Sequence, residues 1–157
     1  MNFQQMRPET AGRLNPVIQL GDDVLQACED AQVEGLETDL ALAISDLSAK
    51  HAAALVALKR DVFAAGAAPK ETGTWRGVTE RTISGVKSAF MDIDGQSRAL
   101  VALSQHARWQ DAAREVLVGG LPAEQQDLLN SHYEATRIAA DTVDCALRHG
   151  GSSGQAC

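Results

Sequence analysis

Residues 37–65 read ETDLALAISDLSAKHAAALVALKRDVFAA, and this stretch decides the fold. Apolar side chains recur here at every third or fourth position, the spacing of one helix face. The predicted inner stripe is Leu40, Ile44, Leu47, His51, Leu55, Leu58 and Val62. Gly66 and Pro69 follow the stretch and indicate a helix end. The pattern predicts an amphipathic helix of about 28 residues, roughly 42 Å long.

The same periodicity predicts three further long helices, over about 16–33, 96–118 and 121–149. Pro16 and Pro122 fall in a first helical turn, where the missing N–H costs nothing. A shorter helix is predicted over about 75–91. No strand-like alternation interrupts this order. We therefore expect an all-α protein, an antiparallel four-helix bundle over 15–149 with a short extra helix in the link between its second and third long helices. Flexible segments are expected over 1–14 and 150–157.

Charge and hydropathy exclude several classes of partner. The formal net charge is −7, with 14 basic residues against 21 acidic ones. Binding to nucleic acid or to an anionic membrane needs clustered Lys and Arg, so neither is expected. The longest apolar run, 52–58, is far shorter than the ~20 residues of a membrane helix. With no signal-like segment at the start, these features predict a cytoplasmic protein whose three cysteines are reduced.

The order of features carries a resemblance. The second long helix ends in the glycine-rich stop from Gly66 to Pro69, the short helix holds Arg81 and Lys87, and a Leu121-Pro122 turn precedes the last helix. Over about 15–148 this layout resembles a bacterial family of ferritin-like four-helix bundles of unknown function, in the rubrerythrin/ferritin-like superfamily. The resemblance implies a ferritin-like bundle with a carboxylate metal site.

That implied site is degenerate in this chain. Gln105-His106 stands where the relatives carry a Gly-Glu pair, and Ala113 stands where they carry a tyrosine. A di-iron carboxylate bundle also needs a Glu followed by a His three residues later on two helices. No Glu or Asp in the sequence has a His at that spacing.

Three histidines, His51, His106 and His132, fall near the middle of the predicted inner stripes of three helices. Three imidazoles at one level would suit a transition metal such as Fe, Zn, Cu or Ni. One alternative is a buried polar layer, in which Gln110, Thr136 or water satisfies neutral histidines. Another is that a predicted stripe is rotated by one position and a histidine is exposed.

No nucleophile–base–acid arrangement and no phosphate-binding loop occurs in the sequence. The first hypothesis is therefore a non-enzymatic ferritin-like bundle with an interaction or stress-related role. Its partner would be another protein or a second copy of the chain, as in a homodimer, bound through an exposed apolar strip. The second hypothesis is a metal-binding or redox bundle that uses the three histidines. Beyond such a transition metal, the sequence implies no cofactor.

Overall fold

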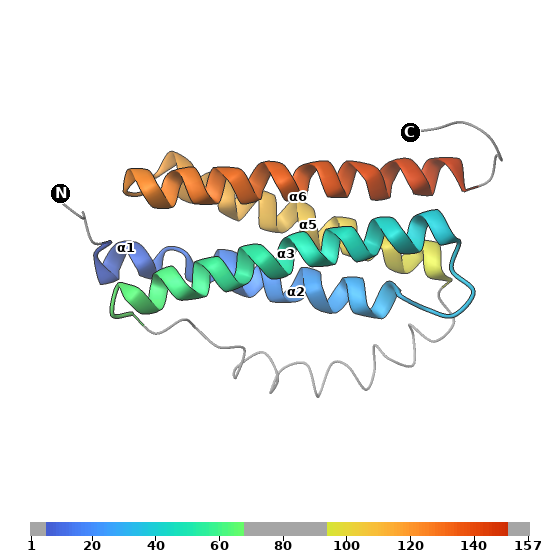
Figure 1. The fold of residues 1–157 in the computed structure, drawn as a ribbon, viewed down its shortest axis with the longest axis horizontal. Helices are drawn as coiled ribbons and strands as arrows, with labels where there is room; N and C mark the ends of the chain where they lie inside the picture. Colours follow the sequence, from blue (N-terminus) through green and yellow to red (C-terminus); the bar gives the residue numbers. More distant parts are fainter. Residues whose placement is uncertain (1–5, 68–93, 151–157) are drawn as a thin grey trace.

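The computed structural model describes residues 6–67 and 94–150, and the regular structure within these ranges is helical. A short helix, α1 (Pro8–Gly12), precedes four long ones: α2 (Asn15–Ala31), α3 (Thr38–Ala64), α5 (Gly95–Val118) and α6 (Ala123–His149). The long helices lie side by side (Figure 1). The predicted all-α class and helical bundle are confirmed. The short helix expected over 75–91 and the tail over 151–157 lie outside the described residues.

The helix ends show how the long helices are arranged. At one end of the bundle, residues 33–37 of the α2–α3 turn, Asp94–Gln96 at the start of α5 and Gly150 after α6 line one open hollow. At the other end, Arg13 before α2 donates to the carbonyl oxygens of Gly119 and Gly120, at 3.2 Å each. The end of α3 and the start of α5 therefore lie at opposite ends of the bundle, as Figure 1 shows.

Packing between the helices places α3 and α5 on one diagonal. Helix α2 packs against both α3 and α5, and α6 packs against the same two helices. The core is built from Ala, Leu, Val and Ile side chains, so the helices approach one another closely. The two diagonal helices then meet at the centre of the bundle, where their inward side chains share one space.

The end of α3 follows from Gly66. Its φ of +75° is in the left-handed region that favours glycine. The Gly66 N–H donates to Phe63 O at 3.0 Å and the Ala67 N–H to Val62 O at 3.2 Å, which is the paired bonding of a Schellman motif. The start of α5 is capped differently, because the Asp94 carboxylate accepts from the Ser97 N–H at 2.8 Å. Both boundaries fall within two residues of their predicted positions.

The N-terminal segment differs from the prediction. Residues 8–12 form α1, with Pro8 in its first turn, and α1 packs against α3. Met6, Ala11 and Leu14 are buried. The sequence predicts a flexible segment over 1–14, whereas residues 6–14 pack on the bundle, because three widely spaced apolar side chains hold the short helix there.

The predicted inner stripes hold for α3 and shift on the two later helices. All seven predicted positions of α3 are buried. For the helix over 96–118 periodicity predicts Leu103 and Gln110 on the inner stripe, but both are half-buried, and the buried face of α5 includes Ala102, Trp109 and Val116. For the helix over 121–149 periodicity predicts Leu128 and Leu147 on the inner stripe, whereas Leu129 and Ala140 are buried on α6 and the two predicted residues are half-buried. When a helix has few large apolar residues, the sequence pattern does not determine well which of its faces is buried. Both α5 and α6 are helices of this kind.

The structure also bears on the hydropathy of the helices and on the state of the cysteines. Among the described residues α3 alone has the length and mean hydropathy of a membrane span, and 44% of that window is buried inside the molecule. A core helix passes the same test, so the indication is weak. Cys28 is buried and free, and burial raises the pKa of its thiol to about 11.

Candidate functional site

Two of the three predicted site histidines meet at the centre of the bundle. His51 lies midway along α3 and His106 midway along α5. The Nε2 of His51 and the Nδ1 of His106 are 2.9 Å apart, a hydrogen-bond distance. The His51 side chain is fully buried and His106 is 4% exposed. The bond therefore joins the two diagonal helices across the core.

Trp109, one turn after His106 on α5, packs against both rings. Its ring meets His51 edge to face, with centroids 4.8 Å apart, and lies nearly parallel to His106 at 6.1 Å. The side chain is 1% exposed. The helical pattern predicts Trp109 beside the inner stripe, at the bundle rim, whereas in the structure it is the largest fully buried side chain among the described residues. Its ring therefore covers both histidine side chains with apolar surface.

The surroundings keep both imidazoles neutral. Desolvation, with a smaller contribution from the nearby His106, lowers the pKa of His51 to about 3. Desolvation also lowers the pKa of His106 to about 4, although the negative charge of Asp141 partly opposes this shift. Both values lie well below neutrality, so the pair carries no charge at pH 7.

Neutrality fixes what the pair can do chemically. Each neutral ring carries one N–H and one lone pair, and the bond between the rings uses one of each. The two outer nitrogens, Nδ1 of His51 and Nε2 of His106, are buried without a hydrogen-bond partner. One of them is thus a donor and the other an acceptor, and exchanging both tautomers reverses the roles. The lone pair is also the group that would ligate a metal.

His132, the third predicted ligand, does not join the pair. Within 6–67 and 94–150, no group of three or more His, Cys, Asp or Glu side chains is placed to hold a metal ion. His106 lies twelve residues before the end of α5, whereas His132 lies nine residues after the start of α6. This difference puts His132 about one turn, ~4.5 Å, nearer the α5–α6 turn. There His132 is half-buried, and desolvation lowers the pKa of its imidazole.

Thr136 and Gln110, the side chains that the sequence suggested as hydrogen-bond partners for the histidines, do not bind the pair. The Thr136 hydroxyl donates to the backbone oxygens of His132 and Tyr133, at 2.9 and 3.1 Å. Gln110 is half-buried. Since each histidine is the other's partner, the polar layer consists of the pair itself.

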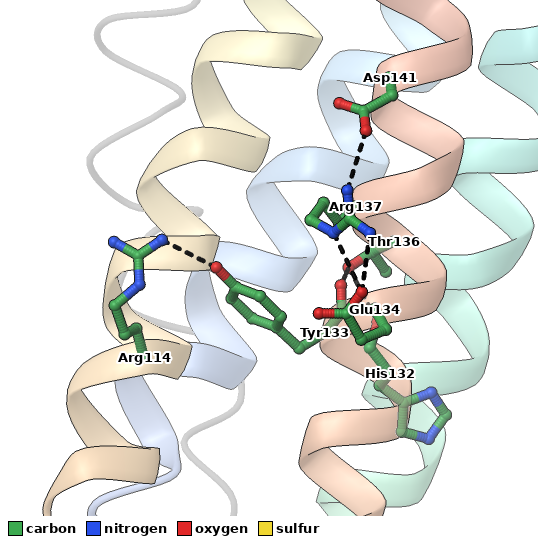
Figure 2. A network of polar contacts seen from close by, with 7 residues as sticks. All are labelled: Arg114, His132, Tyr133, Glu134, Thr136, Arg137 and Asp141. Atoms are coloured by element: carbon green, nitrogen blue, oxygen red, sulfur yellow. Dashed lines mark hydrogen bonds and ion pairs between the residues drawn. The ribbon is translucent and has the colours of Figure 1, made fainter.

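A second set of polar contacts involves side chains of α5 and α6 (Figure 2). The Arg114 guanidinium on α5 donates to the Tyr133 hydroxyl on α6 at 2.8 Å. The Tyr133 ring lies nearly parallel to Trp109, with centroids 6.4 Å apart. On α6 itself, Arg137 bonds to both Glu134 and Asp141. Sequence reasoning missed the Arg114–Tyr133 bond, because nothing in either helix pattern signals a bond between helices.

No protein-family model, curated protein or solved structure matches this chain.

Proposed function

We propose that the chain is a ferritin-like, antiparallel four-helix bundle that works without catalysis, through association with protein. In this proposal the histidine pair is a structural element of the core. The observation that carries it is the 2.9 Å bond between His51 and His106. Because the facing nitrogens bind each other beneath Trp109, they are engaged within the protein.

The ferritin-like arrangement is supported by the positions of the helix ends. Since α3 ends and α5 begins at opposite ends of the bundle, the link between them has to cover the bundle's length. A bundle with one long crossover of this kind is the ferritin-like connection. Each long helix would then run antiparallel to both of its neighbours.

A structural role for the pair follows from its place on the diagonal. A buried polar group is costly unless it is satisfied, so a shift of α3 along α5 would separate the two rings and leave more nitrogens unpaired. The bond therefore favours one register of the two helices, a role attested for buried polar residues in helical assemblies. Such a pair serves the fold and needs no ligand.

A metal-binding or redox bundle is the second candidate, favoured by one observation. The outer nitrogens of His51 and His106 have no hydrogen-bond partner, and neutral imidazole nitrogens ligate Zn, Cu, Fe and Ni. A metal would need further ligands, and a shift of α6 by about one turn would bring His132 closer to the pair. The stress-related role and the cytoplasmic location remain predictions.

Elemental analysis separates the two candidates. Untagged protein is incubated with Fe, Zn or Cu, freed of excess metal and compared with a His106→Ala/His132→Ala variant and a His149→Ala control. The proposal expects the same metal content, well below one ion per chain, in all three proteins. About one ion per chain in the parent and the control, lost in the double variant, would establish the metal-binding candidate instead.

A further inference from the structure

The outer face of α3 carries an apolar strip. Leu42, Val56 and Phe63 are 65%, 70% and 76% exposed. Together with Ala49, also exposed, they recur every seven residues, so they lie along one line of the helix. This line, which we call the outer strip, is opposite the buried stripe of the same helix. Apolar side chains repeated at this interval are the pattern that helices use to pack along one another.

We propose that the outer strip binds the outer strip of a second copy, so that two α3 helices pack antiparallel at the centre of a homodimer. This inference rests on the proposed function and names its partner. A two-fold axis is the commonest symmetry of protein dimers, and it requires a surface that complements itself. The outer strip satisfies that requirement in one register.

That register is centred between Ala52 and Ala53. Leu42 and the partner's Phe63 then lie at one level, because they are equally distant from the midpoint. Ala49 and the partner's Val56 are matched in the same way. Leu42 thus faces the large side chain of the partner's Phe63, and Val56 faces the small side chain of the partner's Ala49. Because alanines also lie at the midpoint of the interface, the two helices can approach closely.

Charges beside the strip favour the antiparallel direction. Asp46 is exposed near the start of α3, and Arg60 near its end has a side chain that is 71% exposed. Antiparallel packing brings Asp46 of each protomer beside the partner's Arg60, at nearly the same level. Parallel packing would instead bring each charge beside its own copy. Arg60 also has a local contact with Asp61 at 3.5 Å, which leaves most of the guanidinium open to a second carboxylate.

Sedimentation equilibrium of the full chain tests the apolar part of the proposal. The parent should be a dimer, and Leu42→Glu/Phe63→Glu should raise the dissociation constant about 30-fold or more, because each charge would lie in the interface. Ile138→Glu is the matched control, since Ile138 is a 58% exposed apolar residue on α6, and it should leave the dimer intact. Far-ultraviolet circular dichroism verifies that each variant is folded.

Charge reversal tests the register. Asp46→Arg and Arg60→Asp should each weaken the dimer, because like charges then meet twice in the symmetric interface. The double variant Asp46→Arg/Arg60→Asp should restore it, whereas the control Asp127→Arg on α6 should have no effect. If the double variant is weaker than both single ones, the antiparallel register is wrong.

Other outcomes would overturn the dimer itself. A parent that stays monomeric at all concentrations, or a dimer unaffected by Leu42→Glu/Phe63→Glu, contradicts it. Co-sedimentation of a monomeric parent with phosphatidylcholine–phosphatidylglycerol vesicles, lost in the same variant, would assign the strip to a membrane. These results leave the metal analysis unchanged, so failure of the dimer is distinguishable from failure of the proposed function.

Discussion

The bond between His51 and His106 joins α3 to α5 at the centre of the bundle. A bond of this kind contributes little net free energy when both partners are present, since it replaces bonds to water. Removing one partner has a larger effect, because the remaining ring stays buried with another unpaired nitrogen. Replacing one histidine should therefore lower the free energy of unfolding more, per residue replaced, than replacing both with apolar residues.

His51→Leu and His106→Leu should each lower the free energy of unfolding by about 1–3 kcal/mol. The double variant should lose less than the sum of the two, since no buried ring is left unpaired. Urea denaturation of the four proteins measures the coupling. His132→Leu, at a half-buried position, serves as the comparison and should show no coupling to His51→Leu. Strict additivity of the two central substitutions would contradict the paired arrangement.

Stability should also depend on pH through the same two rings. Their pKa values in the folded protein, about 3 and about 4, lie below the ordinary value of 6.5. Between these limits the unfolded chain binds more protons than the folded one, so acid favours unfolding. The contribution of the two neutral rings to the free energy of unfolding should therefore be complete above about pH 6.5. It should decrease as the pH falls towards 4.

The His51→Leu/His106→Leu variant isolates this contribution. Urea denaturation between about pH 4.5 and 7.5 should give a steeper loss of stability for the parent than for the variant. The parent's excess slope cannot exceed about 1.4 kcal/mol per pH unit for each ring. Equal slopes in the two proteins would show that the rings are accessible to protons in the folded state.

At the residue scale, the sequence predicted which histidines lie inward on α3 and α5 but not how they are satisfied. The spacing of apolar residues located His51 and His106, because each lies on a helix face whose other residues are mostly apolar. Periodicity cannot place two helices in register, so it aligned His132 with them although it lies about one turn away. Trp109 could have been assigned to the core, since Ala102, His106, Trp109 and Ala113 follow helical spacing.

At the scale of elements, helix termini are set by local backbone chemistry. The +75° φ of Gly66 lets the chain reverse and satisfy the last carbonyls of α3. An L-residue with a Cβ is strained in this conformation even though no other atom lies within 4 Å of the position. Since the strain comes from the backbone, it applies to any side chain placed there.

Gly66→Ala should lower the free energy of unfolding by about 1–2 kcal/mol. Gly12→Ala is its control, because Gly12 is helical, has a φ outside the left-handed region and has open space around it. The control should keep the parent's stability or exceed it by up to about 1 kcal/mol. Thermal unfolding followed by circular dichroism compares the two. Equal effects of the two substitutions would rule out the left-handed cap.

Element boundaries were predictable wherever a local signal marks them. Gly66 and the Asp94 cap are such signals, and the ends of α3 and α5 were placed closely. Helix α1 was missed because five residues are too few to show a period. Its stability comes from burying Met6, Ala11 and Leu14 on the bundle, a tertiary effect that local sequence does not reveal.

At the scale of the whole molecule, the proposed homodimer would give helix α3 two roles. Its inner face, which includes His51, holds the core together, while its outer strip is left for a second copy. This division explains why a helix with the hydropathy of a membrane span has only 44% of its apolar window buried within one chain. An exposed apolar strip was predicted, but its position on α3 was not, since that depends on how the helices are placed around one another.

Native mass spectrometry of the untagged protein, after incubation with Zn²⁺ or Fe²⁺, tests the central claim most directly, because one spectrum reports both chain number and bound metal. The untagged protein should give a species of twice the chain mass with no metal adduct. Exchange of subunits with an isotopically labelled copy would produce the mixed dimer, and Leu42→Glu/Phe63→Glu would give the single chain. A single chain in the parent, or about one metal ion per chain that is lost in His106→Ala/His132→Ala, would contradict the account.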